Sequence, residues 1–182
     1  MIRLLKRRLL LRALSRGDDA ARWSAARQLS GPLGRGMREQ FERTLVEAED
    51  PTGRAAAAYV LGFLGDAGAA DALAARLVDV REEPEVRAYA AEALGHLLQL
   101  APVLANVRTA VSRGLRDPTP EVRFWCAFAA ANLELRETRP LLEHLAETDR
   151  ARIDGWWSVA EEAQWALRVL SGEHDAPLPP YE

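Results

Sequence analysis

Apolar residues recur every three or four positions along most of this chain, in runs that short polar segments separate. Phe41 and Leu45 form one such pair, and Leu73 and Leu77 form another. This spacing places apolar side chains on one face of an α-helix, and nothing alternates with the period of two expected of a strand. The pattern predicts an all-α protein without a sheet, with helices over residues 2–16, 19–30, 36–48, 51–64, 67–79, 83–100, 102–116, 120–135, 138–148 and 154–171.

Residues that start and stop helices arrange these helices in pairs. An N-cap-like residue followed by proline begins the first helix of three pairs, at Asp50-Pro51, Glu83-Pro84 and Thr119-Pro120. Turns at Gly65-Asp66 and Ala101-Pro102 lead into second helices, and acidic residues end the second helices at Asp79, Asp117 and Asp149. Each pair therefore consists of a first helix, a short turn and a second helix.

One arginine recurs through the first helices at nearly constant spacing. Alignment superimposes Arg22, Arg54, Arg87 and Arg123, at separations of 32, 33 and 36 residues. Small residues follow each arginine by three and four positions, and leucine or alanine follows it by seven. Trp156 occupies the arginine position in a fifth, degenerate copy. Self-similarity with this period indicates a solenoid, in which each repeat packs mainly against its neighbours.

The repeat boundaries predict a single domain over residues 1–171. It divides into an N-terminal capping helix (1–16), repeats near 18–49, 50–79, 83–117 and 119–149, and a C-terminal cap (152–171), followed by a Gly/Pro tail (172–182). Alanine and leucine make up about a third of the residues, which agrees with a helical fold because both have high helix propensity. Collagen-like, disulfide-framework and mostly disordered chains are excluded by the same composition.

The sequences EVRAYAAEALGHL and GRAAAAYVLGFLGD resemble the short bacterial HEAT-like repeat, the type also found in phycobilisome-lyase subunits. The resemblance covers roughly residues 18–170 and implies a right-handed α-solenoid. It also implies that first helices line the convex side and second helices the concave, partner-facing side. In such repeats the recurring arginine joins a ladder with turn carboxylates, which here implies that Arg54, Arg87 and Arg123 pair with Asp50, Asp79 and Asp117. The ladder should stop at Trp156.

Residues with catalytic or metal-binding potential are few and dispersed. His96, His144 and His174 form no metal-ligand motif, and Cys126 has no cysteine or histidine at ligand spacing. Cys126 occupies an alanine position of the repeat, which favours a small buried side chain over a nucleophile. The loop at residues 31–36 is rich in glycine but lacks the preceding strand and the Lys-Ser/Thr of a phosphate-binding loop. We therefore expect no catalytic residue, no cofactor and no metal.

The second helices present mixed polar faces opposite their buried sides. These faces carry Glu39, Arg43, Asp71, Asn106, Thr109, Arg113, Arg139, Glu143 and Glu147. Both signs of charge occur in every region, whereas a nucleic-acid groove should be a continuous basic stripe. The pattern favours a protein or peptide partner and argues against the HEAT-like DNA glycosylases.

Two tryptophans near the C-terminus are further candidates for partner binding. If a helix begins near Asp154, Trp156 falls on its core stripe, while Trp157 and Trp165 fall outside it. The tail from Ala176 to Tyr181 favours polyproline II, the conformation that docks on aromatic grooves. The hypothesis is that both tryptophans form a dock for this tail or for a partner. The alternative is that Trp157 packs against the 138–148 helix and the tail is disordered.

The N-terminal helix concentrates positive charge in a chain whose net charge is −3. Residues 1–16 contain six basic and no acidic residues, and Ile2, Leu5, Leu9 and Ala13 form one apolar stripe. Leu4, Leu11 and Leu14 lie off that stripe, whereas a membrane-surface helix needs one broad apolar face. A capping helix is therefore favoured. A contact with a partner or a second copy remains open, and membrane or nucleic-acid binding is the least favoured interpretation.

The function that these observations favour is a non-catalytic scaffold or adaptor that binds another protein or a peptide. The first alternative is an accessory or chaperone-like subunit of an enzyme, as with bilin lyases, and the second is a HEAT-like DNA-repair glycosylase. No stretch has the length of a membrane span or the apolar run of a signal peptide. Together with the single cysteine, this predicts a cytoplasmic protein.

Overall fold

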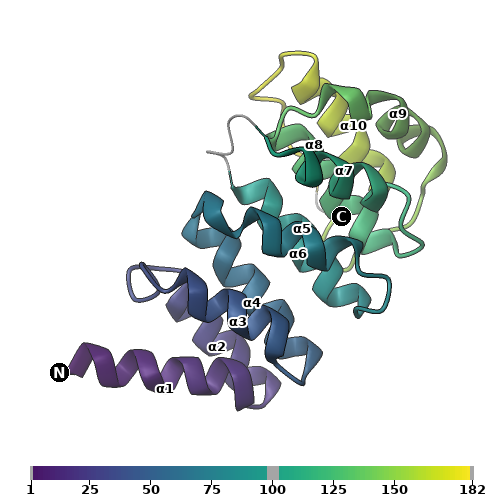
Figure 1. The fold of residues 1–182 in the computed structure, drawn as a ribbon. Helices are drawn as coiled ribbons and strands as arrows, with labels where there is room; N and C mark the ends of the chain where they lie inside the picture. Colours follow the sequence, from purple (N-terminus) through teal and green to yellow (C-terminus); the bar gives the residue numbers. More distant parts are fainter. Residues whose placement is uncertain (1, 98–102, 181–182) are drawn as a thin grey trace.

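The structure, a computed structural model, describes residues 2–97 and 103–180, and the regular elements of this part of the chain are helices joined by turns and loops (Figure 1). The first helices of the pairs are α2 (Asp19–Leu29), α4 (Pro51–Leu64), α6 (Pro84–His96) and α8 (Pro120–Asn132). The second helices are α3 (Arg38–Glu47), α5 (Ala70–Val78), α7 (Ala105–Gly114) and α9 (Arg139–Thr148). Helix α1 (Ile2–Arg16) precedes the pairs and α10 (Val159–Leu170) follows them. The described residues contain no strand, only an isolated bridge between Arg152 and Ser158.

Local sequence explains where the first helices begin and end. Pro51, Pro84 and Pro120 each occupy the first turn, where the missing N–H of proline costs no hydrogen bond. The Asp50 side chain accepts a hydrogen bond from the Thr52 N–H and caps α4. Gly65 ends the same helix in the left-handed region with φ of 65°, a conformation that glycine adopts without steric cost.

Several predicted boundaries differ from those in the structure. Two short 3-10 helices, η1 (Ala67–Ala69) and η2 (Arg136–Thr138), lead into α5 and α9. Helix α6 ends at His96 rather than near residue 100, and α7 begins at Ala105. The predicted turn at residues 101–102 lies outside the described residues.

Helix α10 begins at Val159, not near residue 154. Ser158 and Glu161 form a capping box there, in which the Glu161 carboxylate accepts from the Ser158 N–H at 2.8 Å. Residues 154–158 therefore precede the helix, so a helical projection does not describe them.

The first helices form a tightly packed layer. A methyl group added at Gly62 would lie 2.6 Å from Ala93 Cα, and one added at Gly95 would lie 3.1 Å from Ala129 Cα. Consecutive first helices thus approach almost to backbone contact, and their contacts are much more extensive than those between consecutive second helices. Closer spacing in one layer bends a stack towards that layer. The first helices therefore lie on the inner side of the curve, opposite to the arrangement that the resemblance implies.

Helix α1 caps the N-terminal end of the stack by packing on α2 and α4. Its fully buried residue is Leu14, which lies off the apolar stripe, whereas Leu5 and Leu9 of that stripe are about 60% exposed. Arg7 and Arg3 help to set which face of α1 turns towards the stack, because their guanidinium groups donate to Leu33 O at 2.7 Å and Pro32 O at 2.8 Å. Backbone carbonyls of the glycine-rich loop at residues 31–36 thus accept hydrogen bonds from arginines of α1. No helix among the described residues combines the length and apolar character needed to cross a membrane.

Candidate functional site

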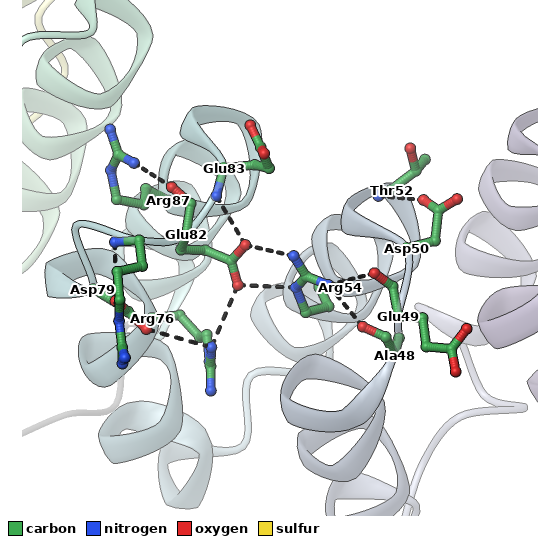
Figure 2. Close-up of polar contacts among 11 residues, drawn as sticks. Ala48, Glu49, Asp50, Thr52, Arg54, Arg76, Asp79, Glu82, Glu83 and Arg87 are labelled. Atoms are coloured by element: carbon green, nitrogen blue, oxygen red, sulfur yellow. Dashed lines mark hydrogen bonds and ion pairs between the residues drawn. The ribbon is translucent and has the colours of Figure 1, made fainter.

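The recurring arginines form a ladder of ion pairs between repeats, and Figure 2 shows the rung at Arg54. Arg54 donates to both carboxylate oxygens of Glu82, at 2.7 and 2.9 Å, and to the carbonyl of Ala48 at 2.7 Å. Arg76 contacts the same carboxylate at 3.3 Å. Burial alone would raise the pKa of Glu82, but the hydrogen bonds and charge of Arg54 hold it below its ordinary value.

Every rung joins an arginine to a carboxylate 26–30 residues further along the chain. Arg22 pairs with Asp50 at 3.1 Å, Arg87 with Asp117 at 3.1 Å and Arg123 with Asp149 at 2.6 Å. Each of these carboxylates lies at the junction that begins the next repeat.

The expected pairing with Asp50, Asp79 and Asp117 therefore needs two corrections. Asp50 pairs with Arg22 rather than Arg54, because each guanidinium reaches forward to the next junction. Asp79 instead accepts from the N–H of Arg81 and lies 3.8 Å from Arg76, and Glu82 takes the ladder position. The fifth copy carries Trp156 where the earlier copies carry arginine, and the last rung ends on Asp149.

The candidate residues on the second helices remain at the surface but do not form one site. Asp71, Asn106, Thr109 and Arg113 line a shallow groove of about 420 Å³ between α5 and α7. Asn106 Nδ2 donates to Asp71 Oδ1 at 2.8 Å. The other candidates lie apart on α3 and α9: Glu39, Arg43, Arg139, Glu143 and Glu147. Arg139 is partly covered and donates to Ser171 Oγ at 3.1 Å.

A row of aromatic rings crosses the opposite, first-helix layer. Neighbouring ring centroids in the row lie 4.6–5.6 Å apart from Tyr59 to Trp156. The row runs through Tyr59, Phe63, His96, Phe128, Trp125 and Trp156, and Trp23 and Tyr89 join it beside Tyr59. Phe63 is 47% exposed and Trp156 is 36% exposed. The row thus keeps large apolar side chains partly exposed along this face.

Beside this row the structure has a groove of about 580 Å³, which we call the aromatic groove. Its walls include four rings, Tyr59, Tyr89, Trp125 and Trp156. Four carboxylates also line it, from Glu85, Glu92, Glu121 and Asp154, and none of the lining residues is basic. The groove thus combines aromatic faces with negative charge.

Burial and neighbouring carboxylates raise the pKa of two groups in the aromatic groove. The pKa of Glu85 is raised, first by burial and then by the charges of Asp19 and Asp50. The pKa of Tyr89 is raised to about 12, by burial and by the nearby Glu92 and Glu85 carboxylates. In both cases the local environment disfavours additional negative charge.

The predicted exposure of Trp157 is wrong. Trp157 is only 2% exposed, its ring lies 6.0 Å from that of Phe124, and its Nε1 donates to Glu162 Oε2 at 2.7 Å. Trp156 is the residue at the surface. The reason is the late start of α10 at Val159, which removes both tryptophans from the helical register that the prediction assumed.

Trp165 does contact the tail. Its ring stacks on Phe128 at 6.3 Å, and its Nε1 donates to the carbonyl of Ala176 at 3.2 Å. Ala176 is 9% exposed, so the tail is anchored at this point. Among the described residues the dock involves Trp165, and Tyr181 lies outside the described residues.

Deleting residues 174–182 is expected to shift tryptophan emission to longer wavelength and to increase quenching by acrylamide. The reason is that Trp165 loses its cover and its hydrogen bond to Ala176. The Trp165→Phe variant is the control, because the same deletion should leave its emission unchanged. Identical spectra for the full-length and shortened wild-type chains would contradict the docked tail.

The cysteine and one of the histidines considered as candidates are packed among other side chains. Cys126 is fully buried beside Gly114, and burial raises the pKa of its thiol. His96 is part of the aromatic row, with its Nε2 3.7 Å from the Glu92 carboxylate. Across residues 2–97 and 103–180, the structure groups no three His, Cys, Asp or Glu side chains in a way that suits a metal ion.

The aromatic row has a signal in the sequence, because aromatic residues recur at equivalent positions of the repeats. Tyr89 and Trp125 each follow the ladder arginine by two positions, Tyr59 and Phe128 follow it by five, and Phe63 and His96 follow it by nine. These offsets fall on one face of a helix. Recurrence of aromatic residues at equivalent repeat positions would have identified this face.

Comparison with known proteins agrees with the observed architecture. Residues 7–95 match the family model of HEAT repeats, and no curated protein matches the sequence. A chain from the complex of CpcE and CpcF of phycocyanin lyase from Nostoc sp. PCC7120 aligns with a TM-score of 0.70 and 20% identity. The alignment covers 93% of this chain and 66% of that chain, so this chain spans just under two thirds of its length.

Two engineered proteins have similar folds. One is an engineered protein with a TM-score of 0.66 and 21% identity, with 91% of this chain and 79% of that chain covered. The other is a designed armadillo repeat protein in complex with the peptide (KR)4, with a TM-score of 0.63, 19% identity and coverages of 88% and 80%. Identities this low show a shared fold. Residues 7–95 thus match HEAT repeats, and the described part of the chain has the helical-repeat solenoid fold also seen in a phycocyanin lyase complex.

Proposed function

We propose that this protein is a non-catalytic, cytoplasmic scaffold that binds another protein or a peptide through the inner, first-helix face. The observation that carries this proposal is the aromatic groove, where half-covered tyrosine and tryptophan rings stand beside carboxylates. Aromatic residues are enriched at protein interfaces, because a large ring contributes contact area at low cost in conformational entropy. The second helices, by contrast, offer mainly small polar and charged groups.

The structural neighbours support a binding role. CpcE and CpcF form a complex with each other, and the designed armadillo repeat protein holds a peptide. Both are stacks of helices, in which the repeated architecture presents an extended surface to a partner. An accessory subunit of an enzyme remains the second candidate, favoured by the similarity to the lyase complex. It would use the same face to hold an enzyme subunit.

Replacing Tyr89 and Trp125 together by alanine tests the proposal. The variant and the wild type are immobilised, exposed to extract of the native host cells, and their bound proteins are quantified by mass spectrometry. We expect a partner that wild type retains and the variant loses. The control carries Asn106→Ala and Arg113→Ala on the second helices, and thermal melting confirms that both variants are folded. Loss of the partner from the control but not from the groove variant would overturn the proposal.

Duplex DNA is not expected to bind near physiological ionic strength. Both faces carry carboxylates, including Glu85 and Glu121 on the inner face and Glu143 and Glu147 on α9, which repel phosphate. Fluorescence anisotropy with labelled duplexes at several salt concentrations measures this directly. Micromolar or tighter binding that weakens steeply with salt would contradict the scaffold and support a glycosylase-like role.

A further inference from the structure

The aromatic groove has an excess of negative charge that the described residues do not neutralise. Of its four carboxylates, Glu92 lies near an imidazole, at 3.7 Å from His96. Within the described part of the chain, Glu85, Glu121 and Asp154 form no ion pair, although each lines the groove. Asp19 and Asp50 also raise the pKa of Glu85, although both are ion-paired with Arg22. A bound group of opposite charge would remove this repulsion.

The rings of the groove form two pairs. Tyr59 and Tyr89, from α4 and α6, meet edge to face with centroids 6.4 Å apart. Trp125 and Trp156, from α8 and the segment before α10, meet edge to face at 5.2 Å. Both pairs line the same groove, so a group bound in it would have aromatic rings of different repeats among its neighbours.

An arginine side chain matches both features. A guanidinium group stacks on aromatic faces, is attracted by their negative quadrupole and donates to carboxylates in a fixed planar geometry. A lysine ammonium shares the charge but not the planar shape. Phosphate, acidic peptides and anionic lipid surfaces would meet four carboxylates and no basic group in this groove.

We infer that the aromatic groove binds an arginine-bearing, extended segment of a partner protein, with a guanidinium held between the tyrosine pair and the tryptophan pair. The inference rests on the proposed function and specifies its ligand. Glu85 and Glu121 provide the charge, and Tyr89 and Trp125 provide the stacking faces. The backbone of the segment lies across the first helices, because the rings come in order from α4, α6, α8 and the segment before α10.

Synthetic peptides built from Gly-Ser-Arg units test this inference by isothermal titration calorimetry with the full chain. The matched control peptide replaces each arginine by citrulline, which keeps the shape of the side chain and removes its charge. We expect the arginine peptide to bind about ten-fold or more tightly than the citrulline peptide, and more weakly as salt increases. Equal affinity of the two peptides would overturn the inference.

Protein variants separate the groove from non-specific attraction to an acidic protein. The double variant Glu85→Gln with Glu121→Gln, and separately Trp125→Ala, should each weaken binding of the arginine peptide about ten-fold. Glu143→Gln with Glu147→Gln removes the same charge from α9 and should leave the affinity unchanged. Equal weakening by both glutamine pairs would show that only net charge matters and would overturn the assignment. Melting curves of each variant confirm that it is folded.

Two outcomes distinguish this inference from the proposed function. If the Tyr89 and Trp125 variant loses its cellular partner but arginine peptides do not bind wild type, the scaffold proposal stands and the arginine assignment is wrong. The basic helix α1 of a second copy offers similar chemistry, and sedimentation velocity tests it. A dimer that the Glu85 and Glu121 variant abolishes would show that the occupant is this chain itself, contrary to the inference.

Discussion

At pH 8.5, the Glu162→Gln variant is expected to melt roughly 10 °C above the wild type, whereas near pH 5 the two should melt at similar temperatures. Glu162 is 2% exposed, and the Trp157 indole donates to its carboxylate at 2.7 Å. Burial raises the pKa of Glu162 to about 8, and the hydrogen bond from Trp157 opposes this only in part. Glutamine keeps an acceptor for the indole and remains neutral at every pH.

The sign of the effect follows from proton binding. In the unfolded chain the Glu162 carboxyl ionises near its ordinary pKa of 4.5, and in the folded protein it keeps its proton up to about pH 8. The folded state therefore binds more protons in this range, and the free energy of unfolding falls as pH rises from 4.5 to 8. The total loss is on the order of 4 kcal/mol for such a difference in pKa.

Circular-dichroism melts of both proteins between pH 5 and 8.5 measure this effect. Glu147→Gln, an exposed glutamate on α9, serves as the matched control and should follow the wild-type profile. Parallel pH profiles for wild type and Glu162→Gln would mean that Glu162 is not kept neutral in the folded protein.

Arg87→Ala is expected to lower the free energy of unfolding by about 2–4 kcal/mol, which corresponds to a decrease in Tm of roughly 5–15 °C. The Arg87 side chain is 8% exposed and donates to both oxygens of Asp117 at 3.1 Å and to the carbonyl of Glu82. Truncation leaves the Asp117 carboxylate, 12% exposed, and a buried carbonyl without this donor. Differential scanning calorimetry gives both Tm and the enthalpy.

The control is Arg168→Ala, which removes an arginine that is also ion-paired. The Arg168–Glu173 pair is about half exposed, and exposed pairs contribute little because water competes for both partners. Equal melting temperatures for the two variants would show that the ladder arginine is ordinary surface charge or serves a partner.

Sequence alone predicted the all-α solenoid and the arginine ladder, but not all of the ladder partners. The spacing of Arg22, Arg54, Arg87 and Arg123 reflects the structural repeat directly. The spacing of the carboxylates is a poorer guide to their partners. The junction after α5 carries Asp79, Glu82 and Glu83 within five residues, and spacing does not say which of them turns inward. That choice depends on the backbone path of the junction, where Asp79 accepts from the N–H of Arg81.

The prediction of which tryptophan is buried failed for a different reason. The sequence Ser158-Val-Ala-Glu161 is a capping box and marks the true start of α10. An assumed start near residue 154 instead placed Trp156 in the core and Trp157 outside it, the reverse of the observed burial. The recurring aromatic positions mark the face on which the aromatic groove lies, whereas the groove itself depends on how closely helices of different repeats approach.

The glycines of the first-helix layer have a consequence for recognition. Gly62 and Gly95 let α4, α6 and α8 meet at backbone contact, and a close-packed backbone has little freedom to change its spacing. The rings carried by these helices are therefore fixed relative to one another before any partner arrives. Such preorganisation reduces the conformational entropy lost on association, so that more of the contact energy appears as affinity. A methyl group at Gly95 would lie 2.6 Å from the Phe128 ring and would displace it. A substitution at this buried glycine would then alter recognition indirectly, through a ring of the aromatic row.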